Sequence, residues 1–527
     1  MARDGELAAL AESIGKDLAS SRPTPKLREL GRIMAGRGLA GELVRCAFAE
    51  ARSKRPKTFR IDGFVYLLGE VLEELRLSSN GGDVKAQREV AETLALIGAE
   101  ASKAAVDPGL LVLMARALKY AGLEPPGQIH DAMVKTLNNN DGGARSDSNQ
   151  GIVCSQLDEM AEAFDQDPFL LHLEFAANAA AFPLEGQVSL IETFFDHPNS
   201  VVRAAGLGFL LSQAGRLSEA ALASCLQSCE RYGVDQAIVS RLVIMRPWLA
   251  SQMRSKVDQA IAHLRRTAPA AQPAPAAHIE HYFSTMCDGA GVQSIFALVR
   301  LGLRWGLVSV LTKDETGVAD VWSAKGMSKK QAGDLIASLF DELGAEKTSA
   351  MFFRRRLEDA LAVNVNASPP PFGLVEACEL LGLGVVAPRR CEPRDLIEEL
   401  LADAPEEQTN ADALARAHAA SMSWAEHAWA ADSWFEAGAE IEALLKPIRG
   451  RPKREAAVIS QILPLRRDFW LRQLAWTAAA LKDQGGLNPM WREMALVGRA
   501  LGAAEDVGAV PFMRAIAAET VRAFAQQ

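Results

Sequence analysis

The segment DPGLLVL at residues 107–113 returns 60 positions later (167 minus 107) as DPFLLHL at residues 167–173. In both copies the aspartate can cap the free amide groups of a helix, and the proline, which has no amide hydrogen, suits the first turn. A third start of this kind, DHPNS at residues 196–200, follows about 30 residues later. Spacings of about 30 and 60 residues suit one and two helical hairpins of a stacked array. This region is therefore predicted to be a series of helical hairpins.

The rest of the chain shows helical spacing as well. Between residues 464 and 484, Trp470, Leu474, Ala478 and Leu481 fall on one helical face. Aromatic residues make up only 6% of the chain, and β-branched runs of period two are hard to find. These patterns predict an all-α protein.

Residues 196–210, DHPNSVVRAAGLGFL, carry a more specific pattern. An Asp and a Pro ahead of Val-Arg-x-Ala and a later Leu resemble the second helix of a HEAT-type repeat, and the resemblance extends loosely over about residues 85–265. HEAT repeats stack as helical pairs into curved solenoids that bind other macromolecules. The resemblance therefore implies a HEAT-like α-solenoid of stacked hairpins and a binding function.

Length and composition suggest two helical parts. A chain of 527 residues exceeds a single ordinary core. The Ala/Pro-rich segment 265–277 is predicted to be a linker between a helical-repeat domain at 1–264 and a helical domain at 278–527. Six of the nine tryptophans lie between residues 424 and 491, which predicts a well-cored final third. The polar stretch 138–151 is predicted to be a loop.

Net charge and cysteine content limit the classes of partner and the cellular compartments that we expect for this protein. A net charge of −9 argues against a surface that is basic throughout, as coating of nucleic acid or an anionic membrane would require. Seven scattered cysteines, an odd number, favour a reducing compartment over a disulfide scaffold. The first twenty residues do not have the pattern of a signal peptide, and no apolar run is long enough to span a membrane. We expect a cytoplasmic protein without a membrane segment.

Two short elements suggest contact with DNA. The stretch RGRPKR at 449–454 resembles an AT-hook, in which flanking arginines enter the narrow minor groove of A·T-rich DNA. The same residues also suit a turn between two helices, with Gly ending one and Pro opening the next. The candidate contact residues are Arg449, Gly450, Arg451, Pro452, Lys453 and Arg454.

The second element lies between residues 318 and 343. A helix through Val321 and Trp322, a turn at residues 325–327 and a new helix capped by Ser328 with Gln331 would form a helix-turn-helix. Ser328, Lys329 and Lys330 would then meet base edges. An ordinary helical hairpin gives the same pattern.

Other charged clusters have simpler interpretations. The basic runs at 52–60 and 354–356 suit solvated faces and salt bridges as well as phosphate binding. His278, His281 and Cys287, and separately Cys225 with Cys229, lack the spacing of a zinc site.

The segment 424–440 places Asp432, Glu436 and Glu440 on one face of an expected helix, with His427 one turn earlier. A solvated acidic stripe explains this pattern, and a metal-dependent helical enzyme is the alternative.

No catalytic set, cofactor loop or metal motif can be assembled from the sequence. The first hypothesis is therefore a non-enzymatic scaffold that binds a protein partner on its surface, and no cofactor is expected. The second is a DNA-associated protein using residues 449–454 and 328–330, and the third is a metal-dependent enzyme using His427, Asp432 and Glu436. The oligomeric state is left open.

Overall fold

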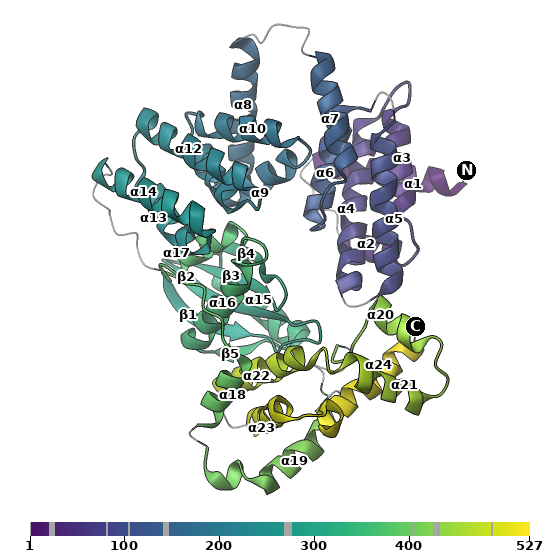
Figure 1. Cartoon of the computed structure of the whole chain (residues 1–527). Coiled ribbons are helices and arrows are strands. Elements are labelled where there is room, and N and C mark those ends of the chain that lie inside the picture. The colour runs from purple at the N-terminus through teal and green to yellow at the C-terminus, as the bar shows by residue number, and fades with distance from the viewer. Residues whose placement is uncertain are drawn as a thin grey trace. The chain divides into compact units, whose positions relative to one another are not determined.

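The computed structural model shows a mostly helical chain that divides into two compact units, residues 1–232 and 233–527 (Figure 1). The structure describes residues 2–19, 27–80, 83–103, 106–140, 147–267, 277–402, 404–424, 427, 433–485 and 489–526. Among these residues, no helix combines the length and the apolar character needed to cross a membrane.

The first unit consists of helices. They are α1 (Ala2–Ala19), α2 (Leu27–Ala35), α3 (Ala40–Ala51), α4 (Thr58–Asn80), α5 (Val84–Ala101), α6 (Pro108–Tyr120), α7 (Gly127–Asn140), α8 (Asp147–Ala163), α9 (Pro168–Ala179), α10 (Leu184–Phe195), α11 (Ser200–Gly206), the 3-10 turn η1 (Leu207–Leu211) and α12 (Gly215–Tyr232). Apolar side chains of α1–α7 form one continuous core.

The helix starts predicted from the Asp-Pro phrases are confirmed. Asp107 caps α6 and Asp167 caps α9, each accepting hydrogen bonds from two backbone amides of the first turn, with Pro at the start of the helix. At the third start the cap is Asn199, whose side chain accepts from the amide of Val201. The stacking of these hairpins into a HEAT-like solenoid stays a prediction.

The second unit contains a sheet that the all-α prediction did not include. The helices α13 (Gln236–Met245), η2 (Arg246–Trp248) and α14 (Ser251–Thr267) precede strands β1 (His278–Ser284), β2 (Val292–Leu301), β3 (Arg304–Lys313), β4 (Gly317–Met327), helix α15 (Lys329–Leu343) and strand β5 (Glu346–Thr348). The five strands form one antiparallel sheet in the order β4-β3-β2-β1-β5. The prediction of an all-α chain is thus only roughly right, and it is wrong for the five strands between residues 278 and 348.

Burial on both faces explains why the central strands β2 and β3 were missed. Phe283 and Phe296 are register partners on the face that packs against α15. The neighbouring Tyr282 points to the other face, where its ring lies 5.0 Å from that of Phe353 on α16 (Ala350–Asn364). A strand covered on both sides reads as a continuous apolar run without the period-two alternation that marks a half-exposed strand.

Helices complete the second unit. They are α17 (Gly373–Leu380), α18 (Pro393–Leu401), η3 (Glu406–Gln408), α19 (Ala411–Ser421), α20 (Ala439–Leu445), α21 (Arg451–Ala457), the π-helical turn η5 (Val458–Ile462), α22 (Arg467–Asp483), α23 (Met490–Ala503), η6 (Val507–Ala509) and α24 (Pro511–Gln526). Trp424, Trp434, Trp470, Trp476 and Trp491 are all buried, as expected for a well-cored final third.

Most of the predicted linker and six residues of the predicted loop fall outside the described residues, and the remaining residues of that loop, 138–140 and 147–151, are helical, so the loop prediction is wrong there. Of the segment 265–277, the first three residues end α14 and residue 277 precedes β1, and the rest is not described. The division between the two compact units falls between residues 232 and 233, so α13, η2 and α14 belong to the second unit. Trp248, for example, is buried and donates from Nε1 to the carbonyl of Val386. In the stretch 138–151, α7 extends through Asn140 and α8 begins at Asp147, and residues 141–146 are not described.

Candidate functional site: an arginine-lined pocket

Two turns at one end of the sheet, β1–β2 and β3–β4, form one part of the site. The β3–β4 turn places Asp314, and Gly317 ends the turn with a positive φ of 81°. A Cβ at Gly317 would lie 2.3 Å from Asn364 Oδ1 and 2.4 Å from the carbonyl of Ala360, so only glycine lets the turn rest on α16. The carbonyl of Gly291, in the β1–β2 turn, accepts from the amide of Asp314. Asp314 is thereby fixed at the sheet end.

Helix α16 supplies a buried ion pair beneath these turns. Arg356 and Asp359 are one helical turn apart, are 1% and 0% exposed, and join through Nη1 and Oδ2 at 3.1 Å. Arg356 also donates to Asp314 at 3.3 Å and to the side-chain oxygen of Gln293 at 2.9 Å. Its guanidinium lies 4.9 Å from the ring centroid of Trp476. Every polar edge of this buried cation is therefore engaged, as a desolvated charge requires.

The C-terminal helices close the site from the other side. Gln473 of α22 donates from Nε2 to Asp314 Oδ2 at 2.6 Å. Arg472, its neighbour, contacts Asp359 Oδ1 at 3.5 Å and donates to the carbonyl of Cys391 at 3.1 Å. The segment before α18 brings Arg390 to within 3.4 Å of the same Asp359 oxygen. Three arginines from different segments thus meet at one carboxylate.

The charges in this cluster do not balance. Among the described residues, Arg356, Arg390 and Arg472 form ion pairs only with Asp314 and Asp359, so one positive charge is left over. The contacts of Arg390 and Arg472 with Asp359 are long for charge-assisted hydrogen bonds, which usually measure about 2.7–2.9 Å. Burial lowers the pKa of Arg472, and among the nearby charges Arg390 acts in the same direction. Asp314 and Asp359 outweigh burial at Arg356 and raise its pKa. An additional anion beside Arg390 and Arg472 would relieve the excess.

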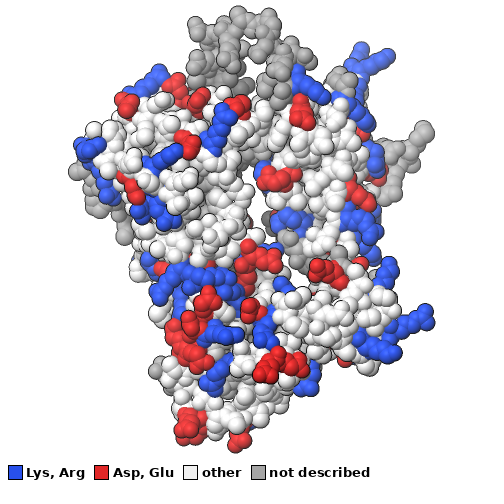
Figure 2. All heavy atoms as spheres, viewed as in Figure 1, with Lys and Arg blue, Asp and Glu red and all other residues white. Residues whose placement is uncertain are grey.

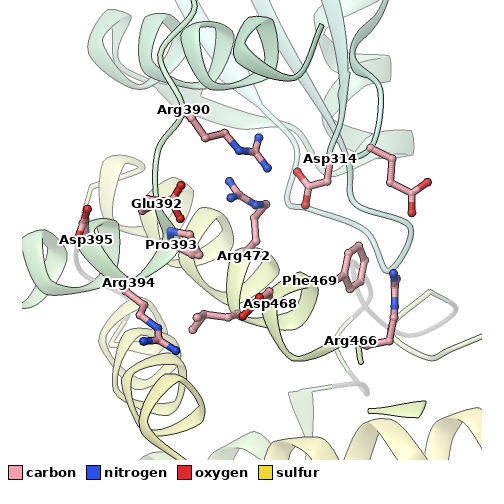
Figure 3. A pocket seen from close by; sticks show the side chains of 12 residues that line it. Asp314, Arg390, Glu392, Pro393, Arg394, Asp395, Arg466, Asp468, Phe469 and Arg472 are labelled. Atoms are coloured by element: carbon pink, nitrogen blue, oxygen red, sulfur yellow. The ribbon is translucent and has the colours of Figure 1, made fainter. Parts of the chain in front are cut away.

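A pocket of about 660 Å³ opens directly onto these side chains (Figure 3). Figure 3 shows the guanidinium groups of Arg390 and Arg472 side by side, with Asp314 opposite and Phe469 below it. The volume suits a small ligand or the end of a peptide. The lining residues are Asp314, Glu315, Arg390, Glu392, Pro393, Arg394, Asp395, Arg466, Asp468, Phe469, Leu471 and Arg472.

The surplus positive charge is confined to the cluster of Arg356, Arg390 and Arg472, because the pocket lining as a whole holds five carboxylates and four arginines. On the face drawn in Figure 2, basic and acidic side chains are interspersed over the described surface of the second unit. A local excess of one charge fits a small acidic group better than the continuous basic track that a nucleic-acid backbone needs.

The AT-hook-like residues form the start of a helix in the structure. Gly450 adopts a φ of 90° ahead of α21, and Pro452 lies in its first turn. Arg451 binds Glu455 at 2.6 Å, and Arg454 donates to the carbonyl of Ile448 at 2.9 Å. The inter-helix turn expected for residues 449–454 is confirmed, and contact with DNA stays a prediction.

The helix-turn-helix geometry predicted around residues 318–343 is wrong in its first half. Val321 and Trp322 lie in strand β4, paired with Val310 and Ser309 of β3, because the β-branched residues of this segment fill a sheet position. The second half is confirmed as a helix, since Ser328 caps α15 and forms a capping box with Gln331. Lys329 and Lys330 are exposed in its first turn. Whether they contact DNA remains untested.

The helix expected over residues 424–440 is not continuous. Residues 433–438 form turns and bends, so Glu436 and Glu440 do not share a helix face, and Asp432 lies outside the described residues. Glu436 is buried and accepts from Arg466 Nε at 3.1 Å and from Trp470 Nε1 at 2.7 Å. The metal-site hypothesis therefore loses the geometry on which it was based, because Glu436 serves a structural ion pair.

The basic runs make salt bridges, in agreement with one of the two interpretations of the sequence. Arg52 pairs with Glu100 at 2.6 Å, and Arg60 pairs with both Glu12 and Glu50. In the run 354–356, Arg354 and Arg355 bind Glu358 and Glu399 respectively, and Arg356 forms the buried ion pairs with Asp314 and Asp359. Cys225, Cys229 and Cys287 are buried.

The amino-acid sequence is similar to two family models and to one known protein. A family model described as the Y4lR C-terminal helical domain matches residues 394–525, and one described as the Y4lR second domain matches residues 183–268. The chain is 26% identical over 352 residues to the uncharacterized protein y4lR of Sinorhizobium fredii (strain NBRC 101917 / NGR234). This alignment covers 65% of the present chain and 66% of y4lR, just under two thirds of its length. No solved structure matches the chain.

The family model of the C-terminal helical domain covers only part of the pocket. The match at 394–525 contains α22 and with it Arg472 and Phe469, whereas Arg390, Arg356 and Asp314 precede the matched segment. The pocket therefore combines part of the Y4lR-like C-terminal helices with the sheet.

Sequence reasoning missed the residues that form this site. Arg472 and Gln473 interrupt the apolar face of α22, and a polar pair within a buried helix is a signal that could have been followed. Asp314, Asp359 and Arg390 carry no local signal, because they meet only through contacts between distant segments.

Proposed function

We propose that this protein is a binding protein that holds a protein partner, and that the pocket of its second unit receives a carboxylate of that partner. The observation that carries the proposal is the cluster in which three guanidinium groups share two carboxylates beside an open cavity. The side chain of Arg390 is 34% exposed and that of Arg472 is 11% exposed, so both can contact a bound group while the floor stays fixed.

The energetics favour such a ligand. A carboxylate that accepts from two arginines gains charge-assisted hydrogen bonds, each contributing about 1.5–3 kcal/mol in protected sites. Arg390 and Arg472 are already partly buried in the unbound protein, so the further cost of removing them from water on binding is small. A cytoplasmic location, favoured by the odd and scattered cysteines, is part of the same proposal.

The test uses two adjacent arginines with different surroundings. Arg390 lines the pocket and Arg389 does not. At constant ionic strength, acetate should raise the melting temperature of the wild-type protein and of Arg389→Ala. It should raise that of Arg390→Ala much less, because a ligand stabilises only the state that binds it. Equal shifts in all three proteins would show that acetate acts through general salt effects and would overturn the proposal.

Affinity purification from native lysate with nuclease treatment extends the test to the partner. We expect a stoichiometric protein that survives nuclease, is retained by Arg389→Ala and is lost by Arg390→Ala. Partners that disappear with nuclease would instead favour the DNA-associated alternative, in which residues 449–454 make the contact.

A further inference from the structure

The mouth of the pocket carries the opposite charge to its floor. We call Arg390, Arg472 and the buried residues that they contact the floor, and the remaining charged lining residues the mouth. Four carboxylates of the mouth are exposed, and the described residues make no ion pair or hydrogen bond to their side chains. Two arginines also lie there, but Arg466 is bound through Nε to both oxygens of Glu436. The four carboxylates are those of Glu315, Glu392, Asp395 and Asp468.

Helix ends do not cancel this negative charge. Glu392 and Asp395 lie at the start of α18, and Asp468 lies at the start of α22, where carboxylates favourably meet the helix dipole. Each helix start is equivalent to only about half a positive charge. Two helix starts and Arg394 therefore offset about two of the four negative charges. Glu315, in the β3–β4 turn, is at no helix end.

The pocket is thus polarised, with a surplus positive charge at its floor and surplus negative charge at its mouth. A ligand that matches this arrangement has an anionic end that goes in first and cationic groups that stay at the mouth. A peptide with a free C-terminal carboxylate and basic residues just before it has this distribution. The cavity volume of about 660 Å³ accommodates more than one amino-acid residue.

We propose that the second unit recognises the free C-terminus of a basic peptide tail, with the terminal carboxylate at Arg390 and Arg472 and the preceding basic side chains at Glu315 and Asp468. This inference rests on the proposed function, because it specifies which carboxylate of the partner enters the pocket. Capture of a C-terminal carboxylate is an established mode of peptide recognition, and here side chains rather than backbone amides would provide it.

Calorimetry with the full chain and four probes tests the inference. The probes are the N-acetylated tripeptide Lys-Lys-Ala with a free C-terminus, its C-terminal amide, the N-acetylated tripeptide Gln-Gln-Ala with a free C-terminus, and L-lysine. The free basic peptide should bind best. Amidation should weaken binding at least tenfold, which is the loss expected for about 1.4 kcal/mol or more of charge-assisted hydrogen bonding. The Gln-Gln-Ala peptide should bind about three- to tenfold more weakly, as two exposed ion pairs imply.

Two sets of variants separate the floor from the mouth. Arg390→Ala should abolish binding of both free-carboxylate peptides, and Arg389→Ala should not. In the double variant Glu315→Gln/Asp468→Asn, the affinity for Lys-Lys-Ala should fall to the level measured for Gln-Gln-Ala. The affinity for Gln-Gln-Ala should stay unchanged. Glu398→Gln is the matched control, since Glu398 is an exposed carboxylate of α18 that does not line the pocket.

The outcomes distinguish this inference from the proposed function. If Lys-Lys-Ala and Gln-Gln-Ala with free C-termini bind equally well, and both lose affinity in Arg390→Ala, the preference for a basic tail is wrong. Carboxylate binding by the pocket would still be supported. A peptide affinity that is unchanged by C-terminal amidation and by Arg390→Ala would overturn both proposals. L-Lysine bound as tightly as the peptide would assign the site to a free amino acid and overturn the peptide partner.

Discussion

Gln473 of α22 donates its side-chain amide to Asp314 of the β3–β4 turn at 2.6 Å, across 159 positions of sequence. Gln473 is fully buried, and Asp314 is also bound by Arg356. This bond joins the C-terminal helices to the sheet and fixes one wall of the pocket. The pocket therefore depends on the docking of α22 as much as on the arginines that line it.

Replacement of Gln473 by leucine should destabilise the second unit by about 2 kcal/mol, because a buried carboxylate loses a donor. Urea unfolding followed by tryptophan fluorescence measures this effect, since all nine tryptophans lie in the second unit. Ser284→Ala is the control, because the buried Ser284 hydroxyl has no hydrogen-bond partner among the described residues and its removal should be nearly neutral. Similar losses in the two variants would contradict the importance of the Gln473–Asp314 bond.

Gly317→Ala should destabilise the same unit by more than about 2 kcal/mol. Its positive φ alone costs about 1–2 kcal/mol for a residue with a side chain, and the added methyl group would collide with Asn364 and Ala360. Gly344→Ala is the matched control, since Gly344 also has a positive φ of 60° but no atoms within 4 Å of its added Cβ. We expect the control to lose about 1 kcal/mol, measured by the same unfolding assay. An equal loss would show that crowding at the turn is unimportant.

The stability of the first unit should fall as the pH is lowered from 7 to 5. Burial lowers the pKa of His172 from 6.5 to about 4, so the folded unit binds fewer protons than the unfolded chain between these values. The stabilisation is present above pH 6.5 and is lost as pH falls towards 4, at a cost of about 2 kcal/mol by pH 5.

Urea unfolding followed by circular dichroism at both pH values measures this dependence. His172→Gln should reduce the pH dependence of the helical signal, because glutamine does not titrate. Tryptophan fluorescence from the second unit is an internal reference that this variant should leave unchanged. A pH dependence that persists in the variant would assign it to other groups.

The double variant Arg449→Ala/Arg451→Ala should leave affinity for A·T-rich duplex DNA unchanged. Gly450 and Pro452 start α21, and Arg451 is paired with Glu455, so the segment does not have the free extended form that enters a minor groove. Fluorescence anisotropy with A·T-rich and G·C-rich duplexes over a series of salt concentrations measures the effect. An A·T preference that the double variant removes would instead support the DNA-associated hypothesis.

Local sequence determined the helix starts and much of the helical core. Asp107 and Asp167 cap α6 and α9 as predicted, and Ser328 caps α15, because capping requires only residues within one turn. Gly450 and Pro452 separate two helices for the same reason. The buried tryptophans of the final third also followed from composition.

Only the tertiary structure decided the sheet and the pocket. Strand β2 is covered on both faces, so its apolar residues show no alternation, and its identity depends on pairing with β1 and β3. Arg390, Asp359 and Arg472 come from three separate segments. Folding removes these side chains from water and brings both arginines to one carboxylate, which produces the local excess of positive charge. No local pattern of residues predicts this contact.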